Sequence, residues 1–273
     1  MTALPESLSE AARAVISEPE PVAKVALTRR FADAWDNGNI AVTGHTPMPD
    51  RPARPAAPEL RPPRDMPKRN PRGEAGRIAF LHAIAHIELN AIDLAWDILG
   101  RFTVEEMPKA FFDDWVAVAL DEAEHFDLLA RRLEALGAAY GDHPAHDGLW
   151  EAAEITADDL AARLALVPMV LEARGLDTTP KAVRQLRDSG DGASADVLET
   201  IATEEIPHVA AGVRWFEFLC DKRGLEPVAE FHRLVGERFR GSLKAPFNEA
   251  ARAEAGFSHH YYRPLASSHS GKS

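Results

Sequence analysis

Two stretches of the chain carry the same Glu-x-x-His pattern inside an otherwise apolar helical stripe. Glu122 and His125 lie three residues apart in DEAEHF, and Glu205 and His208 lie three apart in EEIPH. Residues at this spacing share one face of a helix, so each pair interrupts the apolar line that would face a core. A buried carboxylate is costly unless it is paired or bound to a metal, which restricts the folds open to this chain.

Two other helical stretches each place a single glutamate in their apolar stripe, at Glu88 and at Glu172. Glu88 precedes Glu122 by 34 residues and Glu172 precedes Glu205 by 33, a spacing that predicts two similar helix pairs, each supplying three ligands. We interpret the six side chains as metal ligands supplied by four helices. The six are Glu88, Glu122, His125, Glu172, Glu205 and His208.

Four carboxylates on facing helices would repel one another unless cations neutralise them. Two divalent metal ions supply four positive charges, and two neutral imidazoles complete the ligands. Mixed oxygen and nitrogen ligands suit iron, with manganese as the alternative, whereas zinc usually takes a smaller site richer in Cys or His. The pattern therefore predicts a carboxylate-bridged dinuclear site in a four-helix bundle. Glu204, four residues before His208, stays open as an alternative to Glu205.

Helical periods and capping signals predict an all-α protein. Ser7 in SLSE caps a short first helix. Thr156 and Thr179 read as N-caps, and Gly100 and Gly175 read as helix ends. Pro207 falls inside an apolar stripe, which predicts a bent but continuous helix. The expected helices after the N-terminal region span residues 77–99, 108–136, 157–175, 180–188, 193–222 and 227–239.

Changes in composition divide the chain into four parts. Residues 1–40 form an N-terminal helical appendage, 41–76 a Pro-rich basic extended segment, 77–240 the four-helix bundle, and 241–273 a C-terminal arm and tail. Nine prolines between positions 47 and 71 exclude a helix or a central strand there. The arginines from Arg51 to Arg77 fit a strap lying against an acidic body, or alternatively a patch for an anionic partner such as RNA.

The net charge of −12 argues against a general nucleic-acid coat. Cys220 is the one cysteine, so no intrachain disulfide can form, which fits a reducing cytoplasm. The N-terminal segment lacks the basic-then-apolar pattern of a secretory signal. We find no apolar run of membrane-spanning length, so we expect a cytoplasmic protein without a membrane partner.

A second, polar stripe follows the same helix as Glu88. We expect His82 and His86 to make hydrogen bonds at the surface or to the ligands, with His86 or Asn90 orienting a ligand carboxylate. Asp93 and Asp97 read as solvated or salt-bridged. In the C-terminal arm, His259, His260, Tyr261 and Tyr262 either anchor the arm by aromatic packing or cover the mouth of a pocket.

Four longer motifs carry a family resemblance. They are GRIAFLHAIAHIELNAIDLAWDILGRF, DEAEHF, EEIPHVAAGVRWF and LKAPFNEAARAEAGF. Together with MPKR they resemble the bacterial domain-of-unknown-function family 455. The order Glu, Glu-x-x-His, Glu, Glu-x-x-His across residues 77–223 resembles the ferritin-like di-iron carboxylate superfamily. The resemblance implies a ferritin-like four-helix bundle with the same six residues as metal ligands.

The superfamily resemblance implies a non-haem di-iron or iron/manganese oxidoreductase that activates dioxygen to oxidise or hydroxylate a small molecule or a modified nucleoside. One member of that superfamily hydroxylates a modified tRNA base. The sequence contains no Gly-rich nucleotide fingerprint and no cysteine cluster, so the electrons would come from an external reductase. The alternatives are a ferroxidase, an iron-handling or metal-dependent scaffold protein, and a dimanganese enzyme that decomposes peroxide. No catalytic residue beyond the metal ligands emerges from the sequence.

Overall fold

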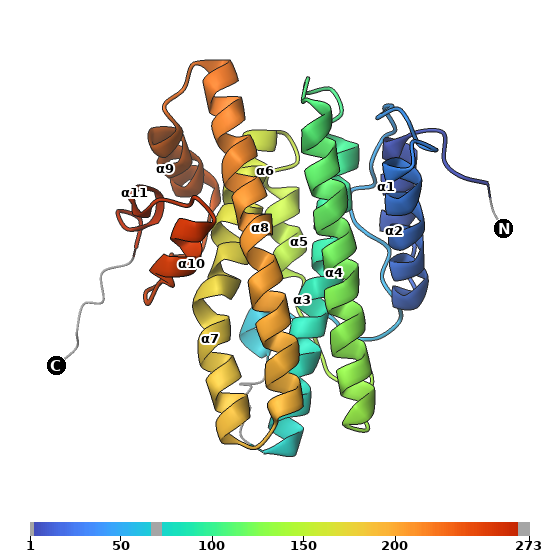
Figure 1. Ribbon diagram of the computed structural model, residues 1–273, viewed down its shortest axis with the longest axis vertical. Coiled ribbons are helices and arrows are strands. Elements are labelled where there is room, and N and C mark those ends of the chain that lie inside the picture. Colours follow the sequence, from blue (N-terminus) through green and yellow to red (C-terminus); the bar gives the residue numbers. More distant parts are fainter. Residues whose placement is uncertain (1–2, 67–72, 267–273) are drawn as a thin grey trace. The chain divides into compact units, whose positions relative to one another are not determined.

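The computed structural model describes residues 3–66 and 73–266 and confirms that the chain is all-α (Figure 1). Within those ranges no strand forms. Lys68, Arg69 and Arg72 of the predicted basic segment, and the polar tail after Ala266, lie outside the described residues.

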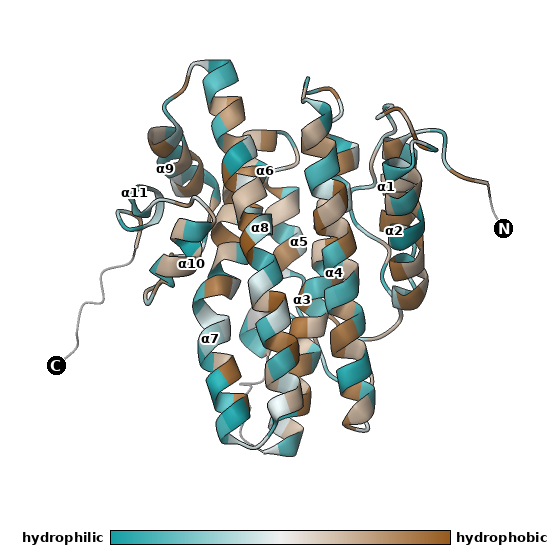
Figure 2. Ribbon diagram, viewed as in Figure 1, coloured by the Kyte–Doolittle hydropathy of each residue, from teal (hydrophilic) through white to brown (hydrophobic). Residues whose placement is uncertain are grey.

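The helical chain divides into two compact units that interleave along the sequence. The first contains Met1–Glu154 and Ala182–Val197, and the second contains Ile155–Lys181 and Leu198–Ser273. Figure 2 shows hydrophilic and hydrophobic residues alternating along the long helices of both, as helices with one buried face require.

The first unit is built on two long helices that pack along each other, α3 (Glu74–Arg101) and α4 (Lys109–Ala135). Helix α1 (Leu8–Ile16) packs on α3, and α2 (Pro21–Asp36) packs on α4 (Figure 1). A short helix that the sequence did not predict, α5 (Gly148–Glu154), also packs on α3. The short connection between α3 and α4 makes them antiparallel neighbours, which brings the middle of each against the other.

Helix α1 begins as predicted, with Ser7 as its N-cap. The hydroxyl of Ser7 accepts a hydrogen bond from the amide of Glu10 at 3.3 Å. The Glu10 carboxylate in turn accepts from the amide of Glu6 at 2.9 Å. These bonds satisfy amides that a helix start leaves without intrahelical partners.

Helix α3 corrects two expectations. It does not end at Gly100 but continues to Arg101, because Gly100 is a site of close approach rather than a cap. A Cβ there would lie 2.5 Å from the sulfur of Met48 and 2.9 Å from Cβ of Ala12. Helix α3 is also long and apolar enough, by length and composition alone, to cross a membrane; 67% of its most apolar window is buried, as in a core helix.

The Pro-rich segment lies against the first unit, as the strap interpretation predicted, and its described residues before α3 include one short turn of 3₁₀ helix, η1 (Pro63–Asp65). Arg51 donates to Asp147 and, at 2.6 Å, to Glu154. The arginine side chain of Arg101 on α3 donates to the carbonyl of Pro49 at 2.8 Å. The strap is therefore held by ion pairs of its arginine side chains and by hydrogen bonds to its backbone carbonyls.

A buried ion-pair network joins the strap to two helices of the first unit. Asp93 on α3 accepts from Lys24 of α2 and from Arg54 of the strap, and Arg54 also donates to Asn90. Lys24 and Asp93 are fully buried. Burial lowers the pKa of the Lys24 ammonium, although the neighbouring Asp93 carboxylate favours its charged form. Of the two alternatives for Asp93, solvated or salt-bridged, the structure shows the salt bridge, and it lies in the interior.

The second unit contains most of the later helical elements. In chain order these elements are α6 (Leu160–Leu166), η2 (Val167–Glu172), α7 (Ala173–Asp188), α8 (Gly192–Arg223), α9 (Pro227–Arg238), α10 (Glu249–Glu254) and α11 (His259–Tyr262). The first half of α7 and most of α8 belong to this unit. Helices α6 and α11 both pack on α9. The C-terminal arm, predicted to be irregular, contains the two short helices α10 and α11.

The helical stretch from residue 160 to residue 188 differs from the prediction. Asp159, not Thr156, caps α6, since its carboxylate accepts from the amide of Ala161 at 3.1 Å. The helix does not end at Gly175; it passes through a π-helical turn, η2, and continues as α7. Thr179 is therefore not a cap, and Pro180 lies inside a helix.

Pro180 is tolerated inside α7 because the C-terminal arm satisfies the carbonyl that it leaves without a helical partner. A proline removes the amide that would bond to the carbonyl four residues earlier, which is that of Leu176. Asn248 of the arm donates its side-chain amide to this carbonyl at 3.1 Å. A sequence rule that ends helices at proline cannot anticipate a donor supplied from 68 positions further along the chain.

Helix α8 is continuous through Pro207, as predicted from its apolar stripe. It approaches η2 closely at Gly212. A Cβ built on Gly212 would lie 2.6 Å from both Cβ and Cγ of Pro168. The proline ring is rigid, so this contact depends on the missing side chain.

Replacing Gly212 by alanine is expected to lower the free energy of unfolding by about 1–3 kcal/mol, because the new methyl group overpacks against Pro168. The matched control is Gly236→Ala on α9, where an added Cβ meets nothing within 4 Å. That control should gain roughly 0.5–1 kcal/mol from helix propensity. Urea unfolding measures both, and equal midpoints for the two variants would contradict the assigned contact.

Candidate metal centre

In the first unit, the predicted ligands Glu88, Glu122 and His125 converge. Glu88 projects from α3, and Glu122 and His125 project from α4. All three are buried, with Glu122 and His125 fully so. The Nδ1 atom of His125 lies 3.5 Å from Oε2 of Glu88 and 3.5 Å from Oε2 of Glu122. The packing of α3 along α4 therefore gathers two carboxylates and one imidazole in the interior.

The charges of this cluster act strongly on His125. Burial lowers the pKa of the imidazole, but hydrogen bonds and charge from Glu122 and Glu88 outweigh this effect and raise it to about 11. Without a metal ion, the imidazole is therefore protonated and offsets part of the negative charge. A metal ion bound at Nδ1 would displace that proton, because only the neutral imidazole coordinates.

In the second unit, Glu205 and His208 repeat this arrangement on α8. The Nδ1 atom of His208 lies 3.7 Å from Oε2 of Glu205, and both residues are buried. Glu172, the remaining predicted ligand, is the last residue of the π-helical turn η2 and is half-buried. Pi-helical turns inside α-helices are frequent at functional sites. The sequence had placed Glu172 on a regular helix, and the change of helix type went unpredicted.

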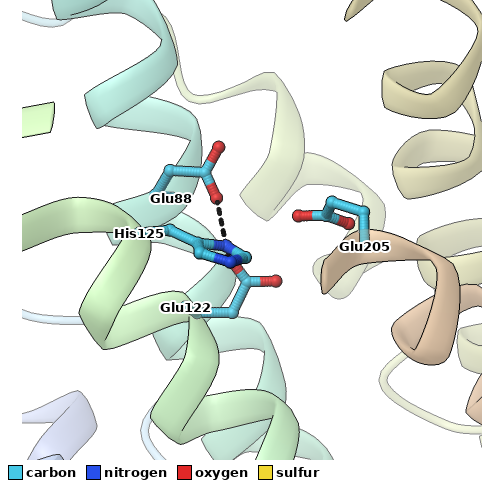
Figure 3. A group of neighbouring side chains, drawn as sticks. All are labelled: Glu88, Glu122, His125 and Glu205. Atoms are coloured by element: carbon cyan, nitrogen blue, oxygen red, sulfur yellow. Dashed lines mark ion pairs between the residues drawn. The ribbon is translucent and has the colours of Figure 1, made fainter. Parts of the chain in front are cut away.

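Glu88, Glu122 and His125 thus form a buried cluster of the first unit that could hold a metal ion. Figure 3 shows these three side chains gathered together, with an ion pair joining Glu88 and His125.

Glu172 on η2 and the pair of Glu205 and His208 on α8 belong to the second unit, and their role as metal ligands stays a prediction.

The donor set of this cluster fits a hard or borderline divalent cation. Glu88, Glu122 and His125 supply only oxygen and nitrogen, the ligands that iron and manganese accept, and contain no thiolate that would favour soft metals. Burial withdraws these donors from water, and a buried carboxylate is favourable only when it is paired or bound to a cation, so the residues present suit a metal centre.

Comparison with known proteins identifies the family. A family model described as "Protein of unknown function (DUF455)" matches residues 17–263. The chain belongs to the DUF455 family. A relative described as "Uncharacterized protein", from Haemophilus influenzae (strain ATCC 51907 / DSM 11121 / KW20 / Rd), is 45% identical over 213 residues, which cover 76% of this chain and 74% of the relative. No solved structure matches the DUF455 chain.

The polar stripe of α3 differs from its prediction in this DUF455 protein. His82 and His86 are buried, so they do not take the surface alternative, and both stack on Tyr140. His86 Nδ1 lies 2.8 Å from the Tyr140 hydroxyl, and Asn90 donates to the His86 carbonyl at 2.7 Å. Burial, and then the charge of Arg54, lower the pKa of His86 to about 3, so its ring is neutral.

Other polar groups of the stripe have structural partners. The amide of Gly141 donates to Nε2 of His82 at 2.8 Å. Asp97 accepts two hydrogen bonds from Arg101, each at 2.9 Å, so of the alternatives solvated or salt-bridged it takes the second. The loop after α4 is thus tied to α3 through imidazoles. In the sequence, only the crowding of Tyr140, His143 and His146 after α4 gave a signal for this contact.

Proposed function

We propose that this DUF455 protein is a non-haem dinuclear metal oxidoreductase of the ferritin-like superfamily, which activates dioxygen to oxidise or hydroxylate a substrate. The observation that carries the proposal is the buried cluster of Glu88, Glu122 and His125, in which Nδ1 of His125 lies 3.5 Å from a carboxylate oxygen of each glutamate. We further propose that Glu172, Glu205 and His208 supply the remaining ligands of two metal ions, on a ferritin-like four-helix bundle. A pair of ferrous ions held there would supply electrons for the reduction of dioxygen, with manganese as the second candidate.

The protein contributes binding, charge and exclusion of water. Glu122 and His125 are fully buried, so bulk water is kept away from their ligand atoms and does not compete with them for a metal ion. Glu88 and Glu205 add negative charge that favours divalent over monovalent cations. The two i, i+3 pairs on α4 and α8 hold each imidazole beside a carboxylate through the rigid geometry of a helix.

A small molecule is the favoured substrate class. Arg51 and Arg54 of the basic strap are engaged with acidic side chains of the first unit, which weakens the case for RNA binding through this segment. A modified nucleoside stays within the small-molecule class. We propose an external reductase as the electron donor, because the sequence contains no nucleotide-binding fingerprint. We also propose a cytoplasmic location, because the lone Cys220 is a buried free thiol.

Anaerobic loading with ferrous iron, followed by addition of dioxygen, tests the proposal. We expect the protein to retain about two iron ions per chain after gel filtration, as its six proposed ligands imply. Addition of dioxygen should give a transient visible absorbance, with dioxygen consumed in proportion to bound iron.

Other results would favour the other functions or none. Slow growth of a ferric core in a large particle would indicate iron storage. Gas evolution from peroxide by the manganese-loaded protein would indicate peroxide decomposition. Absence of iron uptake would contradict the metal centre itself.

A further inference from the structure

The C-terminal arm is anchored on α7 by a buried arginine. Arg252 is 2% exposed, and its guanidinium donates two hydrogen bonds to Asp177, at 2.9 and 2.8 Å. Nη2 also donates to the carbonyl of Ala173 at 3.3 Å. Three aromatic rings surround the guanidinium at 4.4 to 5.2 Å; they belong to Phe247, Phe257 and Tyr262. A buried ion pair with this many partners is a specific anchor that depends on geometry.

A second arm residue extends the anchor. Asn248 donates its backbone amide to Asp177 at 2.9 Å and its side-chain amide to the carbonyl of Leu176 at 3.1 Å. Arg174 of α7 donates to the carbonyl of Lys244 at 2.7 Å. The arm therefore contacts a single turn of α7 through both backbone and side-chain groups.

This turn of α7 directly follows the π-helical turn that ends at Glu172. Ala173, whose carbonyl Arg252 binds, is the residue after Glu172. At the other end of η2, Pro168 packs against Gly212 of α8. The π-helical turn is thus fixed on both sides by contacts within the second unit.

The helix type at η2 determines the direction of Glu172. A π-helical turn accommodates one residue more than an α-helical turn with the same ends. Each residue of an α-helix advances by about 100°, so conversion of η2 into α-helix would rotate Glu172 by roughly that angle relative to α6. Contacts that hold the turn in its π form therefore also hold the carboxylate of Glu172 in one direction.

We propose that the C-terminal arm, through Arg252 bound to Asp177 and Ala173, fixes the end of η2 and so positions Glu172 as a metal ligand. Docking of the arm and binding of the metal are then coupled. Arg252 is a positioning residue that acts through the backbone at Ala173 and does not touch the metal. This inference rests on the proposed function, since it assigns Glu172 to the metal centre.

Coupling between two sites is reciprocal, which gives two independent readouts. Loss of the anchor in Arg252→Ala is expected to weaken Mn(II) binding about 10- to 100-fold, the usual effect of removing a group that orients a ligand. By the same coupling, Mn(II) should slow amide hydrogen exchange of the arm, residues 248–262, in the wild-type protein by a similar factor. Isothermal titration calorimetry and hydrogen-exchange mass spectrometry measure the two effects.

The matched control is Arg263→Ala, which removes an exposed arm arginine paired with Glu249. It should keep the wild-type affinity for Mn(II). If Arg252→Ala does not fold, Asn248→Ala tests the same anchor, and the exchange experiment needs no variant. The inference would be overturned if a folded Arg252→Ala protein bound Mn(II) with wild-type affinity, or if Mn(II) did not change the amide hydrogen exchange of the arm. Neither result would contradict the metal centre itself. A wild-type protein that binds no Mn(II) would instead overturn the proposed function.

Discussion

Replacing Glu122 by glutamine is expected to abolish the rise in melting temperature that Mn(II) gives the wild-type protein. Metal at about 100 times its Kd stabilises a folded protein by about 2.7 kcal/mol. For a chain of this size that corresponds to roughly 5–10 °C. The amide keeps the volume of Glu122 but loses the charge that attracts the cation. A loss of affinity of at least about 100-fold leaves only about 0.4 kcal/mol of stabilisation, or roughly 1 °C.

The same substitution at Glu124 is the matched control, because Glu124 lies on the same helix with its side chain 52% exposed and paired with Arg29. Glu124→Gln should retain the full metal-dependent rise. On α8, Glu205→Gln should lose the rise and its neighbour Glu204→Gln should keep it. Scanning fluorimetry at several Mn(II) concentrations measures all four variants. Equal rises in Glu122→Gln and Glu124→Gln would show that the buried group is not a metal site.

Replacing Asp93 by alanine is expected to cost about 3–5 kcal/mol of unfolding free energy. Asp93 is the shared partner of Lys24 and Arg54, and its loss leaves a fully buried ammonium without its counter-ion. The double variant Lys24→Met with Asp93→Ala should recover part of this loss, because it removes the uncompensated charge as well. Urea unfolding at neutral pH measures both.

Glu237→Ala is the control for this prediction. Its partner Arg233 and Glu237 itself are about half exposed, at 48% and 56%. Exposed pairs contribute little, so the change should stay within about 0.5 kcal/mol. A similar loss in Asp93→Ala and Glu237→Ala would mean that the interior network adds no more than a surface pair.

The apolar stripes predicted the long helices well because burial of one face is a local property of the sequence. Glu122 and His125 were recognised as interior residues from their position in such a stripe, and the structure buries both completely. Continuity of α8 through Pro207 followed from the same pattern. A stripe that runs on past a helix breaker outweighs the breaker, since many buried contacts oppose the loss of one hydrogen bond.

Single-residue signals were less reliable, because their meaning depends on distant partners. Gly100 was expected to end a helix, yet it makes room for Met48 of the strap. Pro180 was expected to begin a helix, yet Asn248 supplies the hydrogen bond that Pro180 removes. His82 and His86 were expected to make hydrogen bonds at the surface or to the metal ligands, yet they are buried and stack on Tyr140. In each case the deciding contact comes from a residue more than 50 positions away.

The sequence by itself determined the helical class, the main helices and the six candidate ligands, because periodic burial and the cost of a buried carboxylate can be read from neighbouring residues. Tertiary structure alone decided that Nδ1 of His125 lies 3.5 Å from a carboxylate oxygen of both Glu88 and Glu122. It also decided that Glu172 ends a π-helical turn next to the anchor of the C-terminal arm. Distances between helices and the type of a helical turn depend on contacts between segments remote in the chain, which no local pattern encodes.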